Sequence, residues 1–199
     1  MTDLEFKFNT NDGYISNEVF ENAVIEDIQL LKADFKEVEF KNCRFINCSF
    51  AGSSFRDCVF KSCDLSNCDF SETYLKNTTF LSCRCDGADI SRSRIKYSEF
   101  EDCSFSYSNF SNSVIENSCF KLVLFKEAFL SEIKLKKTKF NNCNFAGADM
   151  FNTSLKDIDI SSCEIEGIRF SENMWEFRGA IIDPMQSIEI IKALGVKFI

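Results

Sequence analysis

The amino-acid sequence predicts an all-β solenoid made of square coils, and three observations support this prediction. Every fifth residue from Phe20 to Phe170 is large and apolar, which gives 31 centre positions in a row with only Cys85 small. The residue two places before each centre is almost always small or β-branched, and the other three are mostly polar. A period of five fits neither the helical period of 3.6 nor the strand period of 2.0. It therefore indicates a repeat architecture.

This period determines the shape of the coil. Two side chains of every five point inward, so the chain has to turn a corner every five residues, and four corners close a coil of twenty residues. Stacked coils pair their backbones at a spacing of about 4.8 Å. The repeats thus predict about eight coils in a rod on the order of 37 Å long, stabilised by contacts between neighbouring coils.

Three runs carry a resemblance to a known family: Cys43–Asn47 reads CRFIN, Cys48–Gly52 reads CSFAG and Cys68–Glu72 reads CDFSE. They resemble the pentapeptide-repeat family, whose consensus is Ala/Cys-Asp/Asn-Leu/Phe-x-x. The resemblance covers about three quarters of the chain. It implies a right-handed quadrilateral β-helix, in agreement with the square coil, and the sequence adds a short C-terminal α-helix.

The expected corners lie two residues after each centre. Turns with positive φ favour Gly and Asn, and both residue types recur there. These residues are Gly52, Gly87, Gly147, Gly167, Asn42, Asn47, Asn67, Asn77, Asn112, Asn117, Asn142 and Asn152.

We divide the chain into an N-terminal cap segment (1–17), a β-helix (18–182) and a C-terminal helix with a short strand (183–199). In the first segment Leu4, Phe6 and Phe8 alternate with charged residues, which is typical of a half-buried strand. An end coil exposes unpaired backbone and apolar side chains. We therefore expect this segment to cap the first coil.

Beyond Phe170 the register slips by two, so that Phe177 and Ile182 take the centre positions and Trp175 and Ala180 the small ones. Asp183 as N-cap and Pro184 in the first turn then predict a helix. The helix ends at Gly195. Residues 196–199 follow as a short strand.

The apolar stripe of this helix is too wide to cover one coil and leave a solvated back. The run from Phe177 to Pro184 is similar to the C-terminal segment of the dimeric Qnr- and MfpA-type members of the family. That similarity implies a homodimer in which two rods join end to end, and the alternative is a cap on a monomer. The expected interface residues are Met185, Ile188, Ile190, Ile191, Leu194 and Phe198.

Eleven cysteines are distributed according to the repeat: nine in the small inward position, Cys85 at a centre and Cys119 outward. Their parallel Cβ vectors disfavour disulfides between neighbouring coils. A metal site is disfavoured because the chain has no CxxC pair and no His. We expect buried structural thiols without metal or cofactor. One inward ladder comprises Cys43, Cys63, Cys83, Cys103, Cys143 and Cys163.

The period of twenty sorts the outward charges into four faces. The first face, with centres such as Phe35 and Phe55, carries five acids and nine bases. The second (Phe40), third (Phe45) and fourth (Phe50) carry six, seven and six acids against four, three and three bases. Three faces are thus acidic and one is basic, and such a field can select partners. The acids expected to face a partner are Asp69, Glu72, Asp89 and Asp149 on the fourth face.

Leu122, Leu124, Phe129 and Phe151 take outward positions and break the polar-outside pattern. An exposed apolar cluster can mark a contact surface, whereas scattered exposed apolar residues are normal on any protein. Both interpretations stay open at this point.

Catalysis is not expected, because the chain lacks His, a Gly-rich phosphate loop and a nucleophile elbow. A convex rod also offers no cleft for a small-molecule substrate. The sequence has no apolar run long enough for a transmembrane helix and no signal peptide, so we expect no membrane partner and a cytoplasmic location.

The family resemblance implies a sharper function. A doubled acidic rod of roughly 75 Å would imitate about 22 base pairs of DNA. It would occupy the DNA-binding saddle of a type II topoisomerase, DNA gyrase or topoisomerase IV, without contacting nucleic acid itself, and would modulate quinolone sensitivity. Many Qnr-type proteins have loops that interrupt the register, whereas this chain has none between Phe20 and Phe170. The alternative is a scaffold or protein–protein interaction module with an unassigned partner.

Overall fold

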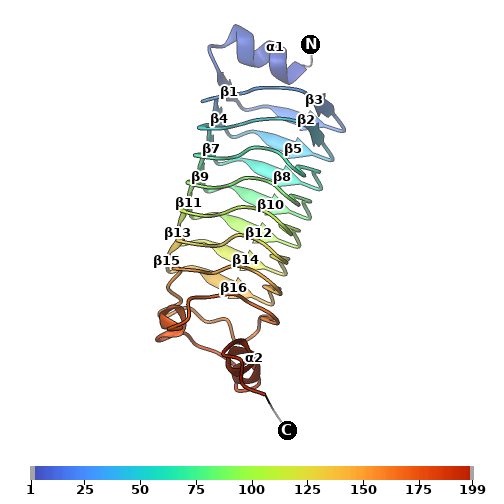
Figure 1. Ribbon diagram of the computed structural model, residues 1–199. Helices are drawn as coiled ribbons and strands as arrows, with labels where there is room; N and C mark the ends of the chain where they lie inside the picture. The colour runs from blue at the N-terminus through green and yellow to red at the C-terminus, as the bar shows by residue number, and fades with distance from the viewer. Residues whose placement is uncertain (1–2, 198–199) are drawn as a thin grey trace.

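The structure is a computed structural model that describes residues 3–197. It is a rod of stacked four-sided coils with a helix at each end (Figure 1). Equivalent residues of neighbouring coils are twenty apart, as in the pairing of Ile15 with Phe35 and of Phe35 with Phe55. The predicted β-solenoid is confirmed.

Two of the four faces are parallel sheets of seven strands each. The first face contains β1 (Tyr14–Ser16), β4 (Asp34–Lys36), β7 (Ser54–Arg56), β9 (Tyr74–Lys76), β11 (Arg94–Lys96), β13 (Val114–Glu116) and β15 (Lys134–Lys136). The second contains β2 (Val19–Glu21), β5 (Glu39–Lys41), β8 (Val59–Lys61), β10 (Thr79–Leu81), β12 (Glu99–Glu101), β14 (Cys119–Lys121) and β16 (Lys139–Asn141).

The third and fourth faces are made mostly of turns. The third face begins as a two-stranded sheet of β3 (Val24–Glu26) and β6 (Arg44–Ile46). Beyond it, single parallel bridges continue the pairing, for example Ser104 to Leu124 on the third face and Asn109 to Phe129 on the fourth. The backbone of each coil is thus hydrogen-bonded to its neighbours on all four sides.

The centre residues fill the interior as stacked aromatic columns. Phe35 stacks on Phe55 with ring centroids 4.6 Å apart, and Phe100 stacks on Phe120 at 4.5 Å. Rings on adjacent faces of one coil meet edge to face, as Phe40 does with Phe45. Such pairs contribute about 0.5–1.5 kcal/mol each beyond the burial of their area. The repeated phenylalanine therefore stabilises the stack along the rod and within each coil.

Every fifth residue from Asp12 to Asp157 has a positive φ, so the predicted corners are confirmed. Gly and Asn occupy many of these positions, but Lys, Glu, Tyr and Leu adopt the same left-handed conformation where the repeat requires it. Tyr107 has φ 61° and Leu122 φ 55°. The stacking of the coils determines the backbone at a corner, and the residue type determines only its energetic cost.

The N-terminal segment forms a helix, α1 (Asp3–Thr10), and the predicted strand over Leu4, Phe6 and Phe8 is wrong. A helix satisfies its own backbone groups, whereas a strand here would need a partner. Leu4 is buried in the core cluster, and Lys7 forms an ion pair with Glu18 at 2.5 Å. The first coil begins at β1, within the segment that we assigned to the cap.

The predicted two-residue slip beyond Phe170 is confirmed. In the regular coils the N–H of Phe145 donates to the carbonyl of Glu164, nineteen residues on, whereas Ile160 donates to Ile181, twenty-one residues on. A 3₁₀ turn, η1 (Trp175–Phe177), lies within this last coil.

Helix α2 (Gln186–Ala193) closes the C-terminal end (Figure 1). Asp183 and Gln186 form a capping box, because Asp183 Oδ1 accepts the N–H of Met185 and Gln186 Oε1 accepts the N–H of Asp183. Gly195 follows the helix with φ 79°, as predicted. The strand expected over 196–199 is not formed at Val196 and Lys197, which have no paired backbone in the described chain, and the last two residues lie outside the described range.

Candidate interaction surfaces

The acidic residues of the fourth face are held in fixed positions. Asp69, Asp89 and Asp149 share one column, and each carboxylate accepts the backbone N–H two residues on at 2.9 Å. Burial raises the pKa of Asp69, but hydrogen bonds from Ser71 and Ser49 outweigh it, so that the pKa lies below its ordinary value. These carboxylates are therefore ordered negative charges that also stabilise turns.

Glu72, on the same face, differs from the three aspartates. Its carboxylate pairs with the guanidinium of Arg92, one coil on, at 3.1 Å. Part of its charge is thus offset within the rod, so the aspartate column is the stronger acidic feature of this face.

The basic charge of the first face is concentrated toward its C-terminal end. Arg56 and Lys96 form ion pairs with Asp34 and Glu116 at 2.5 and 2.7 Å. In contrast, no ion pair within residues 3–197 involves four exposed lysines of the last coils. These are Lys134, Lys136, Lys137 and Lys156.

The four outward apolar residues are all exposed, between 41% and 48%, but they form two separate pairs. Leu122 and Leu124 flank the corner between the second and third faces. Phe129 lies on the fourth face, bridged to Asn109 and Asp149, and Phe151 is on the same face one coil on. Two of these residues thus lie at one corner and two on the fourth face, and their role as a contact surface stays a prediction.

A shallow groove of about 730 Å³ runs along the corner beside Leu122 and Leu124. This groove was not predicted from the sequence. The repeat contained a sign of the groove: Ser82 and Ser104 are small, and they stand in the two columns that hold Leu122 and Leu124 further along the rod.

The residues expected at a dimer interface differ in their exposure on and beside helix α2. Met185, Ile191 and Leu194 are exposed, at 69%, 36% and 50%. Ile190 is buried in the core cluster of the rod itself, and Ile188 is half-buried. Phe198 lies outside the described residues. Three apolar side chains on and beside the helix are thus uncovered within one chain, next to the exposed Lys192.

The inward thiols are buried, as expected, and all eleven cysteines are free. Their sulfurs donate to carbonyls of the preceding coil, as from Cys63 Sγ to Phe40 O at 3.3 Å. Burial raises the pKa of Cys58 to about 11 and that of Cys68 to about 12. Cys119, by contrast, is half-exposed. The ladder therefore consists of free, buried thiols.

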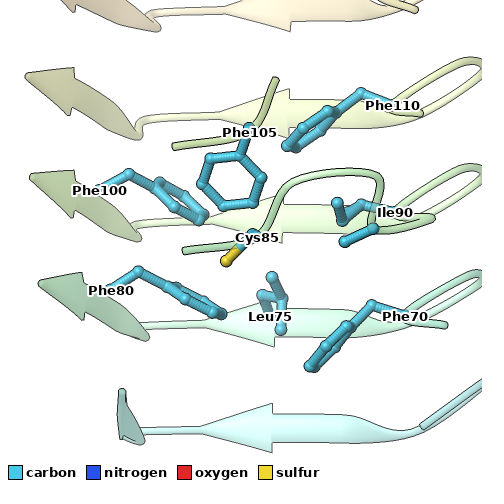
Figure 2. A pocket seen from close by; sticks show the side chains of 9 residues that line it. Phe70, Leu75, Phe80, Cys85, Ile90, Phe100, Phe105 and Phe110 are labelled. Atoms are coloured by element: carbon cyan, nitrogen blue, oxygen red, sulfur yellow. The ribbon is translucent and has the colours of Figure 1, made fainter. Parts of the chain in front are cut away.

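The interior has little free space, and Figure 2 shows one void beside Cys85. This apolar cavity has a volume of about 10 Å³ and lies between Leu75 and Phe80 of one coil and Phe100 and Phe105 of the next. It is large enough for about one water molecule but has no polar partner for it, so we expect it to be dry.

Residues 3–197 contain no group of three or more Cys, Asp or Glu side chains arranged to hold a metal ion. Within the same range, neither helix has the length and apolar character needed to cross a membrane. The surface grooves are shallow, and one of about 840 Å³ lies beside Lys134, Lys156 and Trp175.

Two family models match overlapping parts of the chain. One describes a pentapeptide repeat region and matches residues 53–130, and the other describes eight copies of pentapeptide repeats and matches 123–167. Together they span more than half of the chain. The chain belongs to the pentapeptide-repeat family. The register seen in the structure extends this pentapeptide-repeat assignment beyond the matched range at both ends.

Solved pentapeptide-repeat structures are similar to the rod. HetL from the cyanobacterium Nostoc sp. strain PCC 7120, a protein involved in heterocyst differentiation regulation, is 16% identical and aligns over 91% of this chain and 92% of its own, with a TM-score of 0.53. A trypsin-treated form of QnrB1, a plasmid-mediated fluoroquinolone resistance protein, is 19% identical over 94% of this chain and 100% of its own, with a TM-score of 0.47. At these identities the likeness bears on the fold alone. No curated protein sequence matches the chain.

Proposed function

We propose that this pentapeptide-repeat protein is a non-catalytic rod that presents an acidic, DNA-like surface to the DNA-binding site of a partner protein. The observation that carries the proposal is the column of Asp69, Asp89 and Asp149, whose carboxylates are held by backbone N–H groups. Charges that are already ordered lose little conformational freedom when a partner binds. A net charge of −8 favours encounter with a basic partner.

The specific partner that we propose is a type II topoisomerase, DNA gyrase or topoisomerase IV. Its support is the similarity of the run from Phe177 to Pro184 to the topoisomerase-directed members of the family. Binding in the DNA saddle would then modulate quinolone sensitivity. Duplex DNA has one charge per about 1.7 Å, whereas the acidic faces here have roughly one net charge per 4 Å. We therefore expect a shallower salt dependence than that of DNA binding.

A supercoiling assay of DNA gyrase, titrated with this protein with and without a fluoroquinolone, tests the proposal. Restored supercoiling in the presence of the drug would place the protein with the protective members, and inhibition alone would indicate competition with DNA. No effect at a large molar excess over gyrase and over topoisomerase IV would rule out the topoisomerase proposal.

The role of the charges can be separated from their structural role. Replacing Asp69, Asp89 and Asp149 with Asn removes three charges but keeps an oxygen that can accept the turn N–H. We expect binding to gyrase to weaken at least tenfold while the thermal midpoint stays within a few degrees. The matched control is Asp57→Asn with Asp157→Asn on the basic first face, which should leave binding unchanged.

A second candidate function is a scaffold that binds a partner through apolar contacts. The exposed pair of Phe129 and Phe151 favours it, because both large apolar side chains are nearly half exposed to solvent on the same face. Binding through this pair would be insensitive to salt and to the three Asp→Asn replacements. It would be lost in Phe129→Ser with Phe151→Ser.

We also propose that two rods join end to end through α2. The support is the exposure of three apolar side chains at this end of the rod, Met185, Ile191 and Leu194. Light scattering after size exclusion should give the mass of a dimer for the natural chain and that of a monomer for Met185→Lys with Leu194→Lys. A monomeric natural chain at high micromolar concentration would instead make α2 a simple cap.

A further inference from the structure

The corner groove between the second and third faces has a distinctive lining. One wall is formed by residues that follow the strands of the second face, and the other by residues that begin the turns of the third. Going along the rod, the walls change from polar to apolar at the leucines, and Asn142 makes one wall polar again beyond them. The lining side chains that matter are Ser82, Asp102 and Leu122 on one wall and Arg84, Ser104 and Leu124 on the other.

Leu122 occupies a corner at a cost to stability. Its φ is 55°, in the left-handed region, where a residue with a Cβ is disfavoured by about 1–2 kcal/mol and Asn is tolerated better. The equivalent corner of the next coil is Asn142, with φ 51°. The leucine side chain is 48% exposed, so its burial offsets little of this conformational cost.

Leu124 cannot make a hydrogen bond that two equivalent residues, Asp64 and Asn144, make and that Arg84 and Ser104 of the same column do not. Asp64 Oδ1 accepts the N–H of Ser66 at 3.1 Å, and Asn144 Oδ1 accepts the N–H of Ala146 at 2.9 Å. A leucine cannot accept the N–H of Lys126 in this way. Both leucines thus break local rules of the repeat without an evident structural gain, which is the pattern expected at functional positions.

The charges beside the leucines define the chemistry of an occupant. Asp102 lies in the groove one coil from Leu122 and accepts only a hydroxyl, that of Ser82 at 3.1 Å, with no ion pair within residues 3–197. Asp86 is partly neutralised by Arg84 at 3.0 Å. An aliphatic site beside an acidic one on an acidic face complements a segment that is both aliphatic and basic.

We propose that this groove binds an extended segment of a partner protein, with an aliphatic side chain against Leu122 and Leu124 and a Lys or Arg against Asp102. Neighbouring coils are about 4.8 Å apart, and alternate side chains of an extended chain are separated by roughly 6.6 Å. In the bound segment, the aliphatic residue and the Lys or Arg are therefore separated by one residue. This inference goes beyond the proposed function, because it does not depend on a topoisomerase.

The test uses the full-length protein and fluorescein-labelled synthetic peptides rich in Gly and Ser, with Leu and Arg separated by one residue in either order. We expect at least one order to raise the fluorescence anisotropy at submillimolar to millimolar protein. Replacing the Arg of the peptide with Glu, or its Leu with Ser, should weaken binding at least tenfold. If neither order binds at millimolar protein, the proposal is wrong.

Variants of the protein assign the binding to the groove. Leu122→Asn with Leu124→Asn should weaken peptide binding at least tenfold. The double change should also raise the thermal midpoint, because Asn tolerates the left-handed corner better than Leu does and an Asn at position 124 can accept the N–H of Lys126. Asp102→Asn should weaken the binding of the peptide that contains Arg and should not weaken the binding of the peptide in which Glu replaces Arg.

The matched control is Phe129→Asn with Phe151→Asn on the fourth face, which should leave peptide binding unchanged. Unchanged binding in the leucine variant would overturn the proposal, as would a lowered midpoint, because the leucines would then serve the fold. Neither result bears on the gyrase assay, so the two proposals fail separately.

Discussion

At the scale of single residues, Cys85 occupies a column that holds Leu65 and Phe105 in the coils on either side. Replacing it with Leu fills the adjoining cavity and buries additional methylene groups at about 0.8 kcal/mol each. We predict that Cys85→Leu raises the free energy of unfolding by about 1 kcal/mol, measured as a higher midpoint in urea. The reverse exchange, Leu65→Cys, should lower it, and a lower midpoint for Cys85→Leu would show that the slot is too narrow.

The cysteines give a second prediction at this scale. Ten of the cysteines are buried, out of reach of a reagent, and burial also raises the pKa of Cys58 to about 11 and that of Cys68 to about 12, so that these two form hardly any thiolate at pH 8. With Ellman's reagent at pH 8 we expect one reactive thiol per folded chain, Cys119, and eleven in denaturant. Cys119→Ser should abolish the fast reaction. Rapid modification of several thiols in the folded chain would contradict a closed core.

At the scale of elements, the slip before α2 depends on a buried carboxylate. Glu176 is fully buried, and Oε1 accepts the N–H groups of Asn152 and Ser171 at 3.0 and 3.1 Å, while Oε2 accepts the Ser171 hydroxyl at 2.8 Å. In the regular coils a backbone carbonyl of the next coil accepts the N–H equivalent to that of Asn152. Glu176 thus replaces a backbone acceptor that the two extra residues displace.

This role predicts an acid-sensitive C-terminal coil. Burial raises the pKa of Glu176, but its hydrogen-bond donors outweigh burial and hold the pKa below its ordinary value. Its contribution is therefore complete above the unfolded pKa of about 4.3 and is lost as the pH falls through the lower folded pKa. Glu176→Gln should cost about 1–2 kcal/mol at pH 7. The cost should shrink toward pH 3.

Amide hydrogen exchange at Asn152 and Ser171 measures this effect locally. We expect faster exchange of both amides in Glu176→Gln at pH 7, with the coils before Phe120 unaffected. The control is Glu172→Gln, which changes the same charge on a nearby exposed residue. Equal exchange in both variants would show that Glu176 does not stabilise the two-residue shift in register.

At the scale of the whole molecule, each coil contacts only its neighbours, so stability depends on position along the rod. We predict that amides of the central coils exchange slowest and that protection decreases toward α1 and α2. Hydrogen-exchange mass spectrometry tests this gradient. Uniform protection from end to end would instead indicate a rod that opens only as one cooperative unit.

Much of this fold could be predicted from the sequence because the repeat is unbroken. The centre columns, the corners with positive φ and the slip before Ile182 all follow from counting in fives. Helix α1 could not be predicted in this way, since the alternation of Leu4, Phe6 and Phe8 is short and fits a strand as well as one helical turn in contact with the core. The local pattern does not show that the first coil has to be covered by an element that itself leaves no unpaired backbone edge.

The surfaces were less predictable than the core. Counting placed Leu124 and Phe129 outward and on different faces, but it did not show the groove beside Leu124. The hydrogen bonds of Asp69 and Asp89 to turn N–H groups, and the acceptor role of Glu176, depend on backbone geometry that the repeat does not specify. A pattern of polar and apolar residues predicts which way a side chain points, and not what it binds.

The in-register pairing of residues twenty apart has a genetic consequence. A duplication or deletion of sixty nucleotides within the repeat region adds or removes one coil and leaves every face aligned. A change of fifteen nucleotides preserves the core but turns all later residues by a quarter, which would carry Asp149 away from Asp69 and Asp89. Gene length in such a protein can therefore vary freely only in steps of one coil, whereas steps of fifteen nucleotides rearrange the surface and other in-frame steps disrupt the register of the core.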